Sequence, residues 1–312
     1  IWQEVLGIHN IGITDDFFRI GGDSILAIKV AHRINKVLKY DMNVADIFRY
    51  KTIKKIGSSN ELSSKILKSY SLDYNINRNN IIFIHPAVGG SEVYQNLAEM
   101  LIDYYNCIGI DNHNLNNTKT INSLNKISQL YISTYEERYK LNGITLLGWS
   151  SGGLIALEMA TILEKRGYSD INVILLDTVI TDEKMSVFKQ KQKNKDKIIN
   201  YLKEINIKNP KSVADAEDQI AKSKISSDLI HTNITLFKAI ERDENLEANK
   251  SLSKYVQTLK YNNIDSITNN YIKVIDLECN HMNIIETKKL PIAEYIIKNN
   301  QVVKKTQEFK SK

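Results

Sequence analysis

Strand-like apolar runs that alternate with helical segments constrain this 312-residue chain more than any other feature. Beyond residue 80, six such runs are separated by stretches with helical patterns, such as VYQNLAEMLIDY and GLIALEMATILEKRG. This alternation is typical of βαβ units, and strands that are apolar throughout are typical of a buried parallel sheet. The sequence therefore predicts an α/β domain: a mostly parallel sheet with helices on both faces and strands over residues 81–84, 105–110, 144–147, 171–176, 234–239 and 271–277.

The first 58 residues follow a different pattern. In SILAIKVAHRINKVL, the side chains of Ala27, Ala31, Ile34 and Leu38 recur at spacings of three and four, which places them on one helical face. NVADIFRY and TIKKIGSSN predict short helices after it, and nothing alternates in the manner of a strand. We therefore expect a small all-α domain of four helices. Its first residues, IWQEVLGIHN, look like a helix entered partway, so we expect the chain to be part of a longer protein.

Two further segments complete the predicted organisation. Residues 59–79 are polar and rich in Ser and Asn, which is typical of a linker between a domain over residues 1–58 and a second over 80–305. A long, lysine-rich and mostly helical stretch lies between the fourth and fifth predicted strands. Because it is too long for an ordinary loop, we expect it to form an inserted lid over about residues 181–230.

Composition excludes several classes of protein. The chain has 42 basic and 36 acidic residues, a net charge of +6, and no arginine-rich or aromatic-interleaved patch, so we expect no nucleic-acid partner. The densest basic run, KQKQKNKDK, is typical of a solvated helix face or a mobile loop. No apolar run approaches the ~18 residues of a membrane span, and the first residues lack the basic start and cleavage site of a signal peptide.

The cysteines and histidines point away from a disulfide framework and from a metal site. The two cysteines, Cys107 and Cys279, lie far apart in the sequence, as in proteins of a reducing cytosol, so we expect a cytoplasmic protein. None of the six histidines pairs with another at the i,i+4 spacing of a helical metal site.

The stretch GWSSGG places a serine, Ser150, between a strand and a helix. A bare GxSxG motif is common by chance, but here ITLL precedes it as a strand and GLIALEMATILEKRG follows it as a helix. A serine at such a tight turn is the nucleophile elbow. Gly148 and Gly152 leave room around the serine backbone, and the helix N-terminus behind the serine favours developing negative charge. The context therefore predicts a nucleophilic serine.

A serine hydroxyl needs a base, and in this fold class the catalytic groups follow in the order Ser, acid, His. Asp177 stands where the strand INVILL ends, and His281 follows the last strand. We expect His281 to move the proton and Asp177 to orient the imidazole. Asp243 is a rival acid because it also follows a strand end. His231, which is the only other histidine after the serine, falls in the lid or its hinge.

The stabilisation of an oxyanion requires two backbone N–H donors. One is expected from Ser151, the residue after the nucleophile, and the other from the loop HPAVGG after the first strand of the domain, at Ala87 or Val88. Each donor contributes roughly 3–4 kcal/mol in the transition state. We interpret His85, at the start of this loop, as a structural residue.

A second serine, Ser24, occurs in DDFFRIGGDSILAIKV. Taken alone, a GGDS stretch is explained by a turn at the glycines and by helix capping through Asp23 or Ser24. With its surroundings, however, the segment from IWQEVLGI to IGITDDFFRIGGDSILAIKVAHRIN resembles the peptidyl carrier domain of nonribosomal peptide synthetases, over nearly all of residues 1–58. This resemblance implies that Ser24 carries 4′-phosphopantetheine, whose thiol holds a growing peptide as a thioester.

The second domain resembles the type I thioesterase that ends such assembly lines. FIHPAVGGSEVYQNLA, LLGWSSGGLIALEMA, VILLDT and CNHMNII match its segments in order over about residues 80–300, although the lid is not similar in sequence. The resemblance implies an α/β-hydrolase fold and supports the placement of Asp177. One departure is Asn280, which stands beside His281 where the family usually has a glycine nearby.

Together, the two resemblances imply a terminal synthetase fragment that takes a peptide from the carrier onto Ser150 and releases it by hydrolysis or macrocyclisation. The implied partners are upstream condensation and adenylation domains, a phosphopantetheinyl transferase and a peptidyl thioester substrate. Two alternatives stay open. An editing thioesterase would remove wrong acyl groups from carriers, although the fused carrier argues against it. An inert hydrolase fold would serve as a docking module, although the Ser-Asp-His order argues against that.

Overall fold

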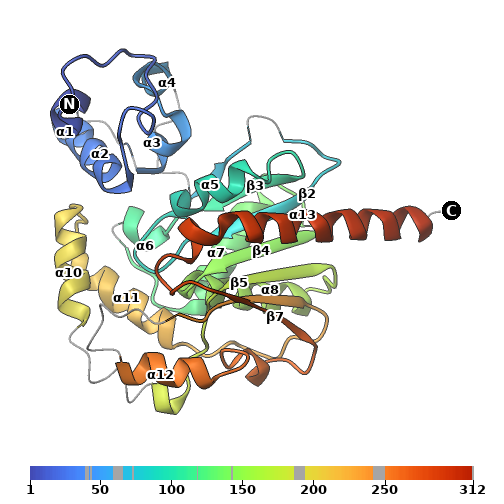
Figure 1. Ribbon diagram of the computed structural model, residues 1–312. Coiled ribbons are helices and arrows are strands. Elements are labelled where there is room, and N and C mark those ends of the chain that lie inside the picture. Colours follow the sequence, from blue (N-terminus) through green and yellow to red (C-terminus); the bar gives the residue numbers. More distant parts are fainter. Residues whose placement is uncertain are drawn as a thin grey trace.

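The computed structural model shows a small helical domain followed by an α/β domain (Figure 1). It describes residues 1–38, 42, 44–58, 66–71, 74–117, 119–141, 143–185, 194–241 and 250–310. Among the described helices, none combines the length and apolar character that crossing a bilayer requires.

The helical domain consists, in its described part, of α1 (Trp2–Leu6), α2 (Ser24–Leu38), α3 (Val44–Tyr50) and α4 (Ile53–Ser58). Of the face that the periodicity of α2 predicted, Ala27, Ala31 and Ile34 are buried, and they share an apolar cluster with Ile47 of α3. The ring of Trp2 meets that of Phe17 edge-on at 4.9 Å between centroids. The prediction of a four-helix domain is therefore confirmed, with a core of its own that buries two aromatic side chains.

In the described part of the α/β domain, seven strands form one sheet in the order β1-β3-β2-β4-β5-β6-β7. All neighbouring pairs are parallel except β1 and β3, which are antiparallel. The six strands predicted from the sequence are present. The bounds are β1 (Leu67–Ser69), β2 (Asn79–Ile84), β3 (Tyr105–Ile110), β4 (Ile144–Trp149), β5 (Ile171–Leu176), β6 (Asn233–Ala239) and β7 (Ile272–Leu277).

Strand β1 is a feature that the sequence did not predict, because it lies inside residues 59–79, where we expected a linker. A charged residue, Lys68, stands in the middle of this three-residue strand and hides its apolar character. The ammonium group is buried against the carboxylate of Asp111, with Nζ and Oδ2 2.7 Å apart. The sheet therefore takes up part of the segment that was predicted to connect the domains.

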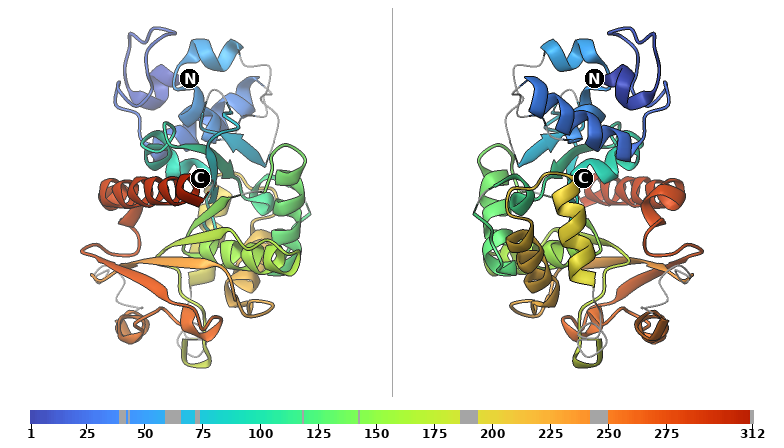
Figure 2. Two further views of the ribbon diagram at one scale, coloured as in Figure 1. Left: turned by 90° about the vertical axis from the view of Figure 1, so that its right-hand side faces the viewer. Right: turned by 90° about the vertical axis from the view of Figure 1, so that its left-hand side faces the viewer.

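Helices cover both faces of the sheet, as predicted (Figure 2). On one face, α7 (Leu124–Glu136) and α8 (Ser151–Lys165) pack into one apolar cluster with the strands. On the other face, α5 (Gln95–Glu99), which follows the 3-10 turn η1 (Ser91–Tyr94), and α13 (Ile284–Lys310) form a second cluster. The short helix α6 (His113–Asn116) follows β3.

Two helices, α10 (Asn194–Glu204) and α11 (Pro210–Lys222), lie between β5 and β6, where the lid was expected. They have a small apolar cluster of their own around Leu202, Val213 and Ala214, and Val88 of the loop after β2 packs against it. Residues 186–193 of this segment lie outside the described residues. The next connection carries α12 (Lys250–Thr258) and the turn η3 (Ile264–Ser266).

The two domains touch through polar side chains. Lys51, after α3, forms an ion pair with Glu99 of α5. The side-chain amide of Asn206, in the turn after α10, donates a hydrogen bond to Nε2 of His32 on α2, at 3.2 Å. The helical domain thus contacts both the sheet domain and the lid. Figure 1 shows α2 and α10 on the same side of the molecule.

Candidate active site

Ser150 occupies a sharp turn between β4 and α8. Its backbone has φ 56° and ψ −124°, a strained conformation for a residue with a side chain. The turn is possible because neighbouring backbones approach closely: a Cβ on Gly148 would overlap the backbone of Gly152, and a Cβ on Gly152 would overlap the carbonyl oxygens of Ile84 and His85. Both glycines that the sequence singled out are thus required by packing, and the serine hydroxyl is presented at the end of the sheet.

Three side chains from separate loops form one series of hydrogen bonds. Nε2 of His281 lies 3.1 Å from Oγ of Ser150, and Nδ1 of His281 lies 2.8 Å from Oδ2 of Asp177. Asp177 is only 6% exposed. Because the carboxylate accepts the proton on Nδ1, Nε2 is left as the acceptor that faces the serine hydroxyl. The arrangement is able to remove a proton from Ser150 and to stabilise the resulting imidazolium.

The second oxygen of Asp177 is also held. The backbone N–H of Ala239, at the end of β6, donates to Oδ1 at 3.2 Å, and the side-chain amide of Asn262 donates to the same oxygen at 3.4 Å. Asn262 is fully buried. Sequence reasoning did not identify Asn262, because nothing in the sequence around it relates it to a residue 85 positions earlier.

The loop of His281 is fixed on both sides. The indole N–H of Trp149 donates to the carbonyl oxygen of His281 at 3.0 Å. Oδ1 of Asn280 accepts from the backbone N–H groups of Met282 and Asn283, and Oδ1 of Asn283 accepts from that of Asn280. These hydrogen bonds from the asparagine side chains hold the turn without a glycine. The backbone of Asn280 does not have a positive φ, so the position does not require a glycine. The departure from the family pattern therefore does not disturb the histidine.

The remaining sequence candidates lie elsewhere. Asp243, the rival acid, is outside the described residues. The backbone N–H of His231 donates to Glu164 at 2.9 Å, at the far end of α8 from Ser150. His85 is fully buried, with Nδ1 2.8 Å from the carbonyl oxygen of Pro86 and Nε2 2.7 Å from the hydroxyl of Tyr131. Burial lowers the pKa of His85 to about 4, so its ring is neutral at pH 7.

The three predicted oxyanion donors differ in how they lie relative to Ser150. Ser151 is the first residue of α8, and Ala87 lines the same cavity as Ser150, whereas Val88 packs its side chain against the lid. Within the described residues, no acceptor atom forms a hydrogen bond with the backbone N–H of any of these three residues. Donors that have no partner in the resting protein are what an oxyanion hole needs.

A cavity of about 330 Å³ opens at Ser150 and His281. Its wall is largely apolar, and its polar lining residues besides the reacting side chains are Ser151, Glu241, Ser253 and Gln257. The apolar part comes from the segments after β5, from α12 and from the histidine loop, through Val179, Met185, Leu252, Val256 and Met282. Such a lining suits an acyl chain or apolar peptide better than a charged substrate.

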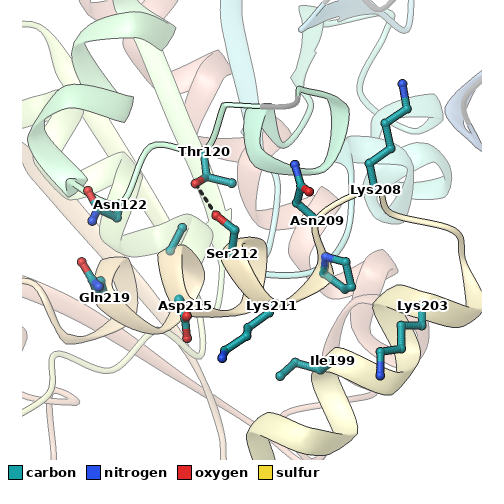
Figure 3. A pocket seen from close by; sticks show the side chains of 12 residues that line it. Thr120, Asn122, Ile199, Lys203, Lys208, Asn209, Lys211, Ser212, Asp215 and Gln219 are labelled. Atoms are coloured by element: carbon teal, nitrogen blue, oxygen red, sulfur yellow. Dashed lines mark hydrogen bonds between the residues drawn. The ribbon is translucent and has the colours of Figure 1, made fainter.

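A second and larger cavity, of about 660 Å³, lies between α10, α11 and residues 120–122 (Figure 3). It is lined by Lys203, Lys208 and Lys211 and shares no residue with the cavity at Ser150. Figure 3 shows the hydroxyl groups of Thr120 and Ser212 in contact, 2.9 Å apart, which ties α11 to the body of the domain. Nothing in its lining suggests a reaction, and we assign none to it.

Ser24 has a different environment. It is the first residue of α2 and is exposed. The helix N-terminus is capped by Asp23, whose Oδ1 accepts from the backbone N–H of Leu26 at 2.7 Å. No hydrogen bond to the Ser24 hydroxyl is formed by the described residues. A hydroxyl that is neither buried nor used as a cap fits the attachment of a phosphopantetheine group by an external enzyme.

Comparisons with known proteins agree with this division. Residues 79–298 match the family model of the thioesterase domain, and residues 1–58 match that of the phosphopantetheine attachment site. Tyrocidine synthase 3 of Brevibacillus parabrevis is 33% identical over 59% of this chain and 3% of its own length. Surfactin synthase subunit 3 of Bacillus subtilis (strain 168) is 32% identical over 57% of this chain and 13% of its own length. The chain thus matches only a small part of these relatives.

Solved structures support the fold. A four-domain nonribosomal peptide synthetase, bound to AMP and glycine, superimposes with a TM-score of 0.56 over 98% of this chain and 25% of its own, at 18% identity. The type II thioesterase of the borrelidin cluster superimposes with a TM-score of 0.56 over 77% of this chain and 97% of its own, at 12% identity.

These identities are too low to transfer more than the fold, whereas the family model covers more than half of the chain. The cofactor of the attachment-site family is covalent 4′-phosphopantetheine. The chain therefore belongs to the thioesterase domain family and carries a phosphopantetheine attachment domain ahead of it, the didomain of a peptidyl carrier and a type I thioesterase that occurs in nonribosomal peptide synthetases.

Proposed function

We propose that this didomain releases a peptide from a nonribosomal peptide synthetase, with Ser24 as the attachment point of the carrier and Ser150, His281 and Asp177 as the catalytic triad. The hydrogen-bonded series from Asp177 through His281 to Ser150, at the mouth of an apolar cavity, is the observation that carries this proposal. The attached phosphopantetheine supplies a thiol that presents the peptide as a thioester. Upstream condensation and adenylation domains and a phosphopantetheinyl transferase are the proposed partners.

In the first step, Oγ of Ser150 attacks the thioester carbonyl while Nε2 of His281 removes the hydroxyl proton. The buried carboxylate of Asp177 keeps the proton on Nδ1 and stabilises the imidazolium. The N–H of Ser151 and that of Ala87 or Val88 stabilise the oxyanion. His281 then returns the proton to the leaving sulfur as the C–S bond breaks, which leaves the peptide as an ester on Ser150.

In the second step, a nucleophile attacks the ester and His281 again acts as the base. Water gives a linear acid, and an amine or hydroxyl of the peptide itself gives a ring. If ring formation is the outcome, the lid would serve it by excluding water from the ester. The carrier contributes by proximity, because a tethered substrate meets Ser150 at a high effective concentration.

The first test is intact mass after incubation with coenzyme A and a broad-specificity phosphopantetheinyl transferase. We expect the wild type to gain one phosphopantetheine group and Ser24→Ala to gain none. A parallel incubation with a fluorophosphonate should add one phosphonyl group to the wild type and to Ser24→Ala, but none to Ser150→Ala. Wild-type protein that is folded and unmodified, yet gains no phosphopantetheine, would contradict the carrier assignment, and absent labelling would contradict the catalytic one.

A further inference from the structure

The lid is connected to the loop of the predicted oxyanion hole by a buried polar chain. Glu217, on lid helix α11, accepts hydrogen bonds at Oε1 from the side-chain amides of Asn112 and Asn114, at 3.1 and 3.0 Å. Asn112 also donates to the carbonyl oxygen of Ala87 at 2.7 Å. Both asparagines are fully buried and Glu217 is 4% exposed. One amide group thus joins a lid carboxylate to the backbone beside the nucleophile.

The bond to Ala87 fixes the direction of a neighbouring donor. The C=O of Ala87 and the N–H of Val88 belong to the same peptide unit, and the structure has no cis peptide bond. In a planar trans peptide the two groups point in opposite directions. Holding the carbonyl oxygen against Asn112 therefore directs the Val88 N–H away from Asn112. The preceding peptide is fixed in the same way, because Nδ1 of His85 bonds to the carbonyl oxygen of Pro86.

An independent contact joins the same two regions. The side chain of Val88 packs against the apolar cluster of the lid, whose fully buried members are Leu202, Val213 and Ala214. Val88, one of the two candidate donors in this loop, is thus also a residue that the lid contacts. If the lid moved away, both the hydrogen-bond chain and this apolar contact would be lost from one short loop.

A buried carboxyl and two buried amides are costly unless each is paired, so this cluster is a poor way to gain stability alone. We infer that Glu217 and Asn112 are positioning residues: the lid holds the Ala87–Val88 peptide in the orientation that serves the oxyanion hole, so the hole is complete only while α11 is docked. The inference rests on the proposed function of Ser150. Neither residue touches the reacting atoms.

The test uses the full chain and a soluble octanoyl-N-acetylcysteamine thioester, so that the carrier plays no part. Asn112→Ser keeps an N-cap for α6 but cannot reach Ala87, and Glu217→Leu removes the acceptor without burying a new charge. Loss of one oxyanion donor lowers kcat ~10²–10³-fold. Since the donor is here misdirected rather than removed, we expect kcat to fall about 10- to 100-fold in both variants.

Four further readouts separate positioning from general damage. KM and the acid limb of the pH profile of kcat/KM should stay unchanged, because the cavity and His281 are intact. Glu217→Gln keeps an acceptor oxygen for the two asparagine amides, so its kcat should equal that of the wild type. The matched control, Asp218→Asn, changes an exposed carboxylate on the same helix and should have no effect. Fluorophosphonate labelling should slow in parallel with kcat.

Equal kcat in wild type and in folded Glu217→Leu would overturn the inference, as would equal losses in Glu217→Leu and Asp218→Asn. Glu217→Leu decides the matter if Asn112→Ser does not fold. Failure of the wild type to label at Ser150 would instead contradict the proposed function, so the two failures are distinguishable.

Discussion

Two serines, Ser24 and Ser150, stand at the start of a helix after a turn that contains glycine, yet their surroundings differ in every other respect. Ser150 has a strained backbone, and its hydroxyl faces His281. Ser24 is exposed, and Asp23 takes over the cap. Under the proposed function, the difference teaches that a serine which must attack is equipped by its own fold. A serine that must only be modified needs access, because the modifying enzyme brings its own catalytic groups.

The largest expected effect separates the two serines by function. Ser150→Ala should lower the hydrolysis of a soluble acyl thioester by at least about 10⁴-fold, because it removes the hydroxyl that Nε2 of His281 contacts. The phosphopantetheine gain at Ser24 should be unchanged. Ser24→Ala should do the reverse: no mass gain and unchanged hydrolysis. Steady-state kinetics and intact mass on both variants check this, and cross-effects on the other activity would contradict the division.

The next prediction concerns the group behind the nucleophile. Asp177→Asn keeps the size of the side chain but presents an amide to Nδ1, which favours the wrong tautomer of His281. We expect kcat to fall about 10³- to 10⁴-fold. A loss below about tenfold would show that another acid, such as Asp243, serves His281.

The two turns also differ in how their glycines are used. Gly148→Ala should destabilise the α/β domain by about 3 kcal/mol or more, because its Cβ would overlap the backbone of Gly152. Gly21 has φ 100° and open space around it, so Gly21→Ala should cost the helical domain only about 1–2 kcal/mol of backbone strain.

The chain has two tryptophans, Trp2 and Trp149, one in each domain. Fluorescence unfolding of Trp149→Phe and Trp2→Phe backgrounds therefore follows the two domains separately.

The free energy of unfolding of Glu217→Gln, relative to that of the wild type, should depend on pH because Glu217 is buried in the lid. Burial raises the pKa of Glu217 from 4.5 to about 7, whereas its two amide donors oppose the shift. A raised pKa means that the folded state binds the proton more tightly, so this stabilisation is present below pH 4.5 and is lost as the pH rises through 7. Relative to wild type, Glu217→Gln should therefore gain about 2–3 kcal/mol between pH 5 and pH 8. A pH-independent difference in denaturant unfolding would contradict this.

The smallest effect tests the cap beside Ser24. Asp23→Ala removes the acceptor for the Leu26 N–H and should destabilise the helical domain by about 1 kcal/mol. The Ser24 hydroxyl should remain open to modification. If the variant instead lost its phosphopantetheine gain while folded, Asp23 would have a role in recognition by the transferase.

Local pattern was enough to predict much of this molecule. Six strands, the turn at Ser150 and the position of Ser24 follow from residues that are adjacent in the sequence. Strand β1 escaped prediction because Lys68 looks exposed until Asp111, 43 residues later, is seen to neutralise it. The contacts of Asn262 with Asp177 and of Glu217 with Asn112 escaped for the same reason, since each joins residues that the fold alone brings together.

The polar contacts between the two domains have a consequence for how firmly the helical domain is held against the α/β domain. Exposed ion pairs such as Lys51–Glu99 contribute about 0–1 kcal/mol each and are screened over roughly 8 Å at physiological salt. In the described residues, the apolar core of the helical domain shares no member with those of the α/β domain. These polar contacts are therefore weak. Under the proposed function, weak contacts would suit a carrier domain that leaves the thioesterase as readily as it docks on it.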